Sequence, residues 1–228
     1  MDRVLVLASG GGSNFQSLID YLAGLKAPNW NIIGLVTSSS SAGALDRAAN
    51  AGIPSVVVET DNAEERDLKL LEAMEFFEPG LVVLAGWLKK IGPEVLGRYR
   101  DSMINIHPGP LPETAGLYGP GVHSRVLELG LTKTAVNIHY VDENYDTGRK
   151  IVTYPITVPN TVRQMDGGKE ATEALQKHVL SIEHRLLPLL VNSLINTASE
   201  TVIQGSTTLV LHNGQKIIDK GRLTVDLG

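Results

Sequence analysis

The chain has 228 residues, 43% of them hydrophobic and 20% charged, which is ordinary for a globular protein with a full core. It has no cysteine and a formal net charge of −5, which excludes disulfides and thiolate metal sites and gives no electrostatic case for nucleic-acid binding. No stretch approaches the roughly 20 apolar residues of a membrane span, and the N-terminus leads directly into an apolar run without room for a signal peptide. We therefore expect a cytoplasmic enzyme, a monomer or homodimer, without nucleic-acid or membrane partners.

The first predicted element is a buried strand over residues 3–8, followed by the glycine-rich sequence Ser9-Gly-Gly-Gly-Ser-Asn14 and a helix. Glycines let the backbone approach a ligand, and the free N–H groups at a helix start favour an anion. The turn lacks the spacing of a nucleotide P-loop or a dinucleotide fold, and no acid follows the second strand, 32–37, to hold a ribose. These absences favour a single small phosphate over NAD as the ligand of this turn. The alternative is a tight turn before a capped helix that binds no ligand.

Strands and helices alternate after this turn. Helices are predicted at residues 42–51, 63–75, 93–100, 122–129 and 169–190, and strands at 55–58, 81–85, 103–106, 134–141 and 149–158. Alternation of this kind predicts an α/β fold with a doubly wound, mostly parallel sheet. Asn213-Gly214 between apolar runs predicts a small antiparallel hairpin over residues 207–219. We expect one domain over 1–228, with a phosphate-binding half (1–100), a catalytic half (101–190) and a tail (191–228).

Polar residues interrupt the strand predicted at 103–106. Asn105 and His107 alternate with Ile104 and Ile106, so both polar side chains leave one face. Pro108 ends the strand because it lacks an N–H group, and the carboxyl ends of parallel strands are where ligands bind. The loop from 108 to 123 contains four prolines and four glycines, and a loop of this length in a compact domain is usually functional.

Four motifs occur in an order that resembles the folate-dependent formyltransferase family: Ser9-Gly-Gly-Gly-Ser-Asn, Leu84-Ala-Gly-Trp, Asn105-Ile-His-Pro and Asp146-Thr-Gly. The Gly-Ser-Asn turn resembles the glycinamide ribonucleotide branch of that family. The resemblance extends from residue 4 to about residue 188. It implies a Rossmann-like formyltransferase fold. It also implies formyl transfer to glycinamide ribonucleotide in purine biosynthesis, with 10-formyltetrahydrofolate as co-substrate and no metal.

The resemblance also implies a role for individual residues. The catalytic set corresponds to Asn105, His107 and Asp146. The nucleotide is expected to contact Gly12, Ser13 and Asn14 through its phosphate and Glu183 through its ribose. The folate is expected to contact Arg66, Leu88, Lys89, Lys90, Ile91, Asn105, Val141 and Asp142.

Three departures concern substrate contacts. The family often reads His-Pro-Ser-Leu-Leu-Pro where this chain has His107-Pro-Gly-Pro-Leu-Pro112, and the loop that follows is longer, with Leu117-Tyr-Gly-Pro-Gly121 before Val122-His123. In addition, Lys89 stands where an arginine is common. The catalytic set is unaffected. Among the other histidines, His139 is expected to be buried with its hydrogen bonds satisfied, and no role is assigned to His123, His178 or His184.

Three alternatives remain open at this point. The first is a formyltetrahydrofolate hydrolase, which usually carries an extra domain before the glycine-rich turn, here beginning at Ser9. The second is a formyltransferase for another amine, such as an amino sugar nucleotide or initiator methionyl-tRNA. The tRNA enzyme adds a C-terminal domain, whereas about 40 residues follow the last long helix here. The third is a non-catalytic nucleotide-binding module.

Overall fold

The computed structural model describes residues 2–166, 168–196, 209–210, 216–219 and 222–223. Seven strands form a sheet in the order β3-β2-β1-β4-β5-β6-β7. The predicted doubly wound, mostly parallel α/β fold is confirmed. The chain divides into two compact units, one of Met1–Ile106 with His139–Arg149 and one of His107–Ile138 with Lys150–Gly228. The division at residues 100 and 190 stays a prediction.

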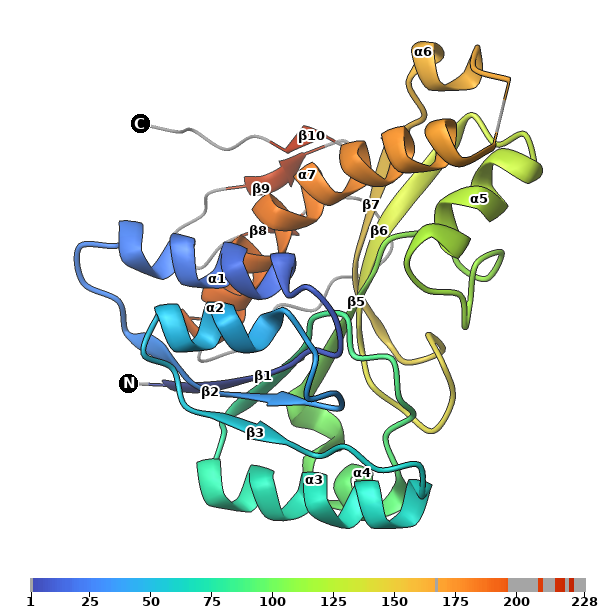
Figure 1. The fold of residues 1–228 in the computed structure, drawn as a ribbon. Helices are drawn as coiled ribbons and strands as arrows, with labels where there is room; N and C mark the ends of the chain where they lie inside the picture. The colour runs from blue at the N-terminus through green and yellow to red at the C-terminus, as the bar shows by residue number, and fades with distance from the viewer. Residues whose placement is uncertain (1, 167, 197–208, 211–215, 220–221, 224–228) are drawn as a thin grey trace. The chain divides into compact units, whose positions relative to one another are not determined.

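The first unit alternates strands and helices almost as predicted. Its strands are β1 (Asp2–Leu7), β2 (Trp30–Thr37), β3 (Ser55–Val57), β4 (Leu81–Leu84) and β5 (Met103–His107), whose last residue belongs to the second unit. Its helices are α1 (Ser13–Gly24), α2 (Ala44–Asn50), α3 (Ala63–Phe77) and α4 (Pro93–Tyr99), and a 3₁₀ turn, η1 (Arg100–Ser102), precedes β5. The β1–β2, β1–β4, β2–β3 and β4–β5 pairs are all parallel. Figure 1 shows α1 and α2 on one face of these strands and α3 and α4 on the other.

The strands of the first unit are apolar because helices bury both faces of the sheet. Val4 to Leu7 are fully buried in β1. On one side, α3 contributes Met74 and Phe77 to a core that also contains Leu5 and Trp87. Apolar side chains on both faces are expected when helices cover both sides of a parallel sheet.

The second unit contains β6 (Lys133–Tyr140, which ends in the first unit), β7 (Lys150–Thr157), and the helices α5 (Pro120–Glu128), α6 (Asn160–Arg163) and α7 (Gly168–Asn196). Both α5 and α6 pack against α7. The tail forms the antiparallel strands β8 (Leu209–Val210), β9 (Lys216–Asp219) and β10 (Arg222–Leu223). The predicted antiparallel tail is confirmed, and the turn predicted at Asn213-Gly214 lies outside the described residues. None of the described helices has the length and apolar character needed to cross a membrane.

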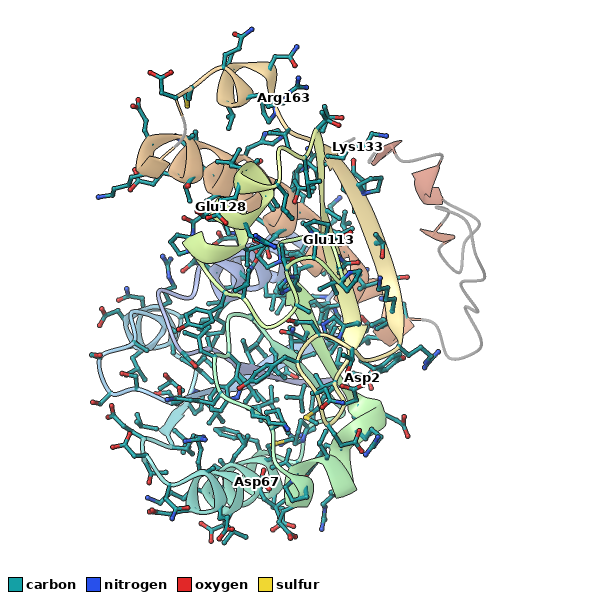
Figure 2. The ribbon with its side chains drawn as sticks, turned by 90° about the vertical axis from the view of Figure 1, so that its right-hand side faces the viewer. Asp2, Asp67, Glu113, Glu128, Lys133 and Arg163 are labelled. Atoms are coloured by element: carbon teal, nitrogen blue, oxygen red, sulfur yellow. The ribbon has the colours of Figure 1, made fainter. Side chains whose placement is uncertain are left out.

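Asp67 joins α3 to the start of α4 (Figure 2). One carboxylate oxygen accepts the N–H of Gly92 and the other that of Glu94, both at 2.9 Å. Asp67 is only 6% exposed, and a Cβ on residue 92 would overlap its carboxylate. A buried side chain of α3 thus satisfies two N–H groups that α4 leaves unpaired at its first turn.

Replacing Asp67 with alanine is expected to lower the free energy of unfolding by about 1–2 kcal/mol, because two buried N–H groups lose their acceptor. Asp67→Asn keeps one of the two acceptors and is expected to lose less. Urea unfolding measures both effects. Glu72→Ala, at an exposed position of the same helix, should stay within about 0.5 kcal/mol of the wild type. An equal loss in all three variants would contradict the capping role.

Candidate active site

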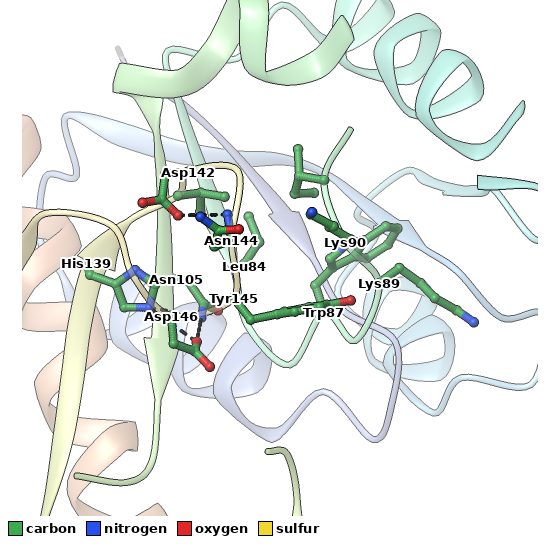
Figure 3. A pocket seen from close by; sticks show the side chains of 12 residues that line it. Leu84, Trp87, Lys89, Lys90, Asn105, His139, Asp142, Asn144, Tyr145 and Asp146 are labelled. Atoms are coloured by element: carbon green, nitrogen blue, oxygen red, sulfur yellow. Dashed lines mark hydrogen bonds and ion pairs between the residues drawn. The ribbon is translucent and has the colours of Figure 1, made fainter. Parts of the chain in front are cut away.

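Asn105, His139 and Asp146 form a hydrogen-bonded cluster in the first unit. Nδ2 of Asn105 lies 3.1 Å from Oδ1 of Asp146 and 3.3 Å from Nε2 of His139. The same imidazole nitrogen lies 3.4 Å from Asp146 Oδ1. Figure 3 shows the three side chains converging from β5, β6 and the loop that follows β6. An amide, an imidazole and a carboxylate therefore meet beside the end of a parallel strand.

A hydrogen bond to a backbone carbonyl fixes the tautomer of His139 in this cluster. Nδ1 of His139 lies 2.8 Å from the carbonyl oxygen of Tyr140, which can only accept, so Nδ1 carries a hydrogen. Nε2 of a neutral His139 is then an acceptor for one Asn105 hydrogen, and Asp146 accepts the other. A substrate oxygen that binds Asn105 must replace one of these acceptors.

The loop after β6 presents Asp146 in an uncommon backbone conformation. Asp146 has a φ of 58°, in the left-handed region that aspartate and asparagine tolerate better than most residues. Asp142 holds the loop, because its Oδ1 accepts the Asn144 N–H at 3.1 Å and the Thr147 hydroxyl at 2.8 Å. The Asp-Thr-Gly motif therefore places a carboxylate next to Asn105.

A pocket adjoins this cluster (Figure 3). It contains two lysines, two aspartates and an apolar wall, and its lining residues are Leu84, Trp87, Lys89, Lys90, Ile91, Asn105, His139, Val141, Asp142, Asn144, Tyr145 and Asp146. The structure thus brings together six of the residues expected to contact the folate: Lys89, Lys90, Ile91, Asn105, Val141 and Asp142. Charges of both signs and apolar carbon suit a flat, polar heterocycle with a charged appendage.

Arg66 and Leu88 are not among the residues that line this pocket. Arg66 is buried at the start of α3, where Nη1 donates to the Thr60 carbonyl at 3.0 Å. Leu88 has an exposed side chain, and its N–H donates to Ser9 Oγ at 3.1 Å. Contact of these two residues with the folate stays a prediction.

His107 ends β5 and belongs to the second unit. It is 3% exposed, and its Nε2 lies 2.9 Å from Thr114 Oγ1.

His123, in α5, is also buried. Burial, with a smaller contribution from the charge of His107, lowers the pKa of His123 to about 4. His123 is therefore neutral near pH 7, and an activity change between about pH 5 and 8 would arise from another group.

The glycine-rich turn lies between β1 and α1. Gly12 has a φ of 70° and immediately precedes α1, which starts at Ser13, while Asn14 is buried in the first turn. Nε of Arg47 donates to the Gly11 carbonyl at 2.7 Å, which fixes the turn from α2. Backbone N–H groups at the start of a 12-residue helix can hold an anion.

Glu183, the residue expected at the ribose, lies in α7 of the second unit and is 4% exposed. Among the described residues, no group of three or more His, Asp or Glu side chains is placed to hold a metal ion.

Sequence reasoning missed His139 as a member of the polar cluster, although it correctly predicted its burial. The signal was present, because Asn137 and His139 alternate with Val136 and Ile138 as Asn105 and His107 do with their neighbours.

Comparison with known proteins identifies relatives over most of the chain. Phosphoribosylglycinamide formyltransferase of Bacillus subtilis (strain 168) is 29% identical over 200 residues, which cover 86% of this chain and 95% of the relative. The chloroplastic phosphoribosylglycinamide formyltransferase of Vigna unguiculata is 34% identical over 198 residues, covering 84% of this chain. This chain spans about three fifths of the length of that relative and of the Arabidopsis thaliana one.

A solved structure that is similar to this chain has the same name as these relatives. The crystal structure of phosphoribosylglycinamide formyltransferase from Bacillus halodurans superposes with a TM-score of 0.77 at 28% identity, over 89% of this chain and 100% of that one. Residues 2–191 match the family described as formyl transferase, which is well over half of the chain. The chain therefore belongs to the formyl transferase family.

Proposed function

We propose that this protein transfers a formyl group from 10-formyltetrahydrofolate to the amine of glycinamide ribonucleotide, a step of purine biosynthesis. The observation that carries the proposal is the Asn105–His139–Asp146 cluster on the wall of a pocket that also contains Lys89, Lys90 and Ile91. The names of the relatives and of the superposed structure support the same reaction.

The reaction needs hydrogen-bond donors and a proton carrier. The amine nitrogen attacks the formyl carbon, which becomes tetrahedral and bears an oxyanion, and the bond from that carbon to the folate nitrogen then breaks. The amine loses a proton and the folate nitrogen gains one. Asn105 is suited to donate to the oxyanion, with the formyl oxygen replacing His139, its more distant acceptor. His107, as an imidazolium, adds a second donor and carries the proton, and the Asp146 carboxylate favours the positively charged imidazole.

The substrates are assigned to separate groups of residues. The nucleotide phosphate is assigned to the turn formed by Gly12, Ser13 and Asn14, and its ribose to Glu183. The folate is assigned to the pocket wall and the acidic loop, with residues Arg66, Leu88, Lys89, Lys90, Ile91, Val141 and Asp142. Anion binding at the start of α1 is supported by the positive end of the helix dipole there.

An assay with both substrates tests the proposal. The protein is mixed with 10-formyltetrahydrofolate, with and without glycinamide ribonucleotide, and deformylated folate is followed by absorbance. Turnover that depends on the nucleotide is the expected result. Equal turnover without the nucleotide would indicate a hydrolase, and preferred turnover with an amino sugar nucleotide would indicate another acceptor. No turnover under any of these conditions would favour a non-catalytic nucleotide-binding module.

Asn14→Leu is expected to raise the KM for the nucleotide by about tenfold or more, because the variant loses a polar contact to a charged phosphate. The KM for the folate should change little. Steady-state kinetics with each substrate varied in turn measures both constants. Asn50→Leu, at an exposed position of α2, is the matched control and should change neither. An equal rise of both KM values in Asn14→Leu would indicate that the turn is structural.

A further inference from the structure

The hydroxyl group of Thr114 lies between the His107 ring and the backbone of the loop that follows β5. Oγ1 of Thr114 is 2.9 Å from Nε2 of His107 and 2.7 Å from the carbonyl oxygen of Pro110. The N–H of Thr114 donates to the same carbonyl at 3.0 Å. Thr114 is fully buried and His107 is 3% exposed, so solvent does not compete for these hydrogen bonds.

The direction of each hydrogen bond follows from the groups involved. A hydroxyl group has one hydrogen to donate, and its oxygen can also accept. The Pro110 carbonyl can only accept, so the Thr114 hydrogen points to Pro110. Oγ1 must then accept from His107, which requires a hydrogen on Nε2 in both the neutral and the charged ring. Nδ1 is consequently the ring nitrogen at which a proton is gained or lost.

Neighbouring residues keep Thr114 in this position. A Cβ on residue 109 would overlap both Thr114 Oγ1 and Val122 Cγ1, so glycine at 109 is required for the close approach. The Gly109 carbonyl accepts from Asn137 Nδ2 at 2.7 Å, and Asn137 Oδ1 accepts from Thr153 Oγ1 at 2.7 Å. The position of Thr114 therefore depends on glycine at 109.

We infer that Thr114 is a positioning residue for formyl transfer: it holds His107 in the tautomer with hydrogen on Nε2 and leaves Nδ1 to exchange the proton. The step in which His107 takes part rests on the proposed function, whereas the tautomer follows from the hydrogen bonds alone. Thr114 acts through His107 and not on the substrate.

The tautomer can be measured without any substrate. The full chain is labelled with ¹⁵N at histidine, and the His107 ring nitrogens are assigned by comparison with His107→Gln. The spectrum is recorded at increasing pH until the ring signals stop changing, which marks the neutral ring. The wild-type ring is expected to carry its hydrogen on Nε2. A wild-type ring with its hydrogen on Nδ1 would overturn the inference before any Thr114 variant is made.

Three variants connect the tautomer to turnover. Thr114→Val preserves shape but removes the acceptor, and it should shift the ring toward the Nδ1–H tautomer and lower kcat on the order of tenfold, with both KM values nearly unchanged. Thr114→Ser keeps the hydroxyl group and should restore both readouts, which keeps the test decisive if the valine variant folds poorly. Thr134→Val is the matched control, because the buried Thr134 hydroxyl has no hydrogen-bond partner within the described part of the chain.

The outcomes separate the two proposals. A Thr114→Val chain with the wild-type tautomer and wild-type kcat would overturn the positioning role and leave formyl transfer in place. The opposite result is also informative. If the wild-type chain transfers no formyl group, the proposed function is overturned. If the His107 tautomer nevertheless changes in Thr114→Val, the role of Thr114 in fixing that tautomer is supported.

Discussion

Asp146→Asn is expected to lower kcat for formyl transfer by about a hundredfold or more. Asparagine tolerates the φ of 58° as aspartate does, and its amide oxygen can still accept the Asn105 hydrogen at the position of Oδ1. The substitution therefore removes the negative charge beside the His139 ring and leaves side-chain shape and protein stability nearly unchanged. The KM for the nucleotide should change little, because its phosphate is assigned to the turn before α1. Steady-state kinetics from about pH 5 to 9 measures the effect across the range in which a histidine titrates.

The control for charge is Asp61→Asn, at an exposed position before α3, which should retain wild-type kcat. His107→Ala is expected to remove most of the activity. If His107 and Asp146 serve the same step, the double variant should be little worse than the worse single variant, because residues that act as a unit do not add. Multiplication of the two losses, or near-normal turnover of Asp146→Asn at every pH, would contradict the proposed mechanism.

Much of the fold could be predicted because its signals are local. The apolar run at the N-terminus is β1, and the helix predicted to start at residue 63 is α3, where Asn62 accepts the Glu65 N–H at 3.0 Å. Alternation along residues 103–106 placed Asn105 and His107 at the end of β5, where the structure has them. Short elements lacked such a signal. α6 has four residues, too few for a helical period to be detected.

The hydrogen bonds that complete the site depend on contacts distant in sequence. His139 meets Asp146 only because the intervening loop turns back with Asp146 at a positive φ, and neither strand nor helix periodicity encodes that turn. Asp67 caps α4 across 25 residues. Thr114 lies in a loop without periodicity, so its hydrogen bond to His107 could not be predicted. Asp146 could still be predicted as a site residue, because the Asp-Thr-Gly motif resembles one of the family's motifs. Thr114 is in none of the motifs that carry the resemblance.

The Tyr140 carbonyl connects the loop that follows β6 to the Asn105–His139–Asp146 cluster. It accepts from Nδ1 of His139 at 2.8 Å, and the Tyr140 N–H donates to the Arg149 carbonyl at 2.9 Å. The Arg149 guanidinium also lies 4.4 Å from the centre of the Tyr140 ring. Hydrogen bonds thus hold both the N–H and the carbonyl of residue 140, and a Cβ on Gly148 would overlap that carbonyl oxygen. Relief of that overlap must displace either the carbonyl that orients His139 or the loop that carries Asp146.

Gly148→Ala is therefore expected to lower the free energy of unfolding by about 3 kcal/mol, the upper part of the usual range for overpacking. It should also lower kcat in the fraction that remains folded, because the Asn105–His139–Asp146 cluster depends on that carbonyl. Urea unfolding and steady-state kinetics measure the two effects. Gly97→Ala is the matched control, since an added Cβ meets nothing within 4 Å in α4, and alanine in a helix should stabilise the chain by about 0.5–1 kcal/mol. Wild-type stability and wild-type kcat in Gly148→Ala would show that the loop can move aside without disturbing His139 or Asp146.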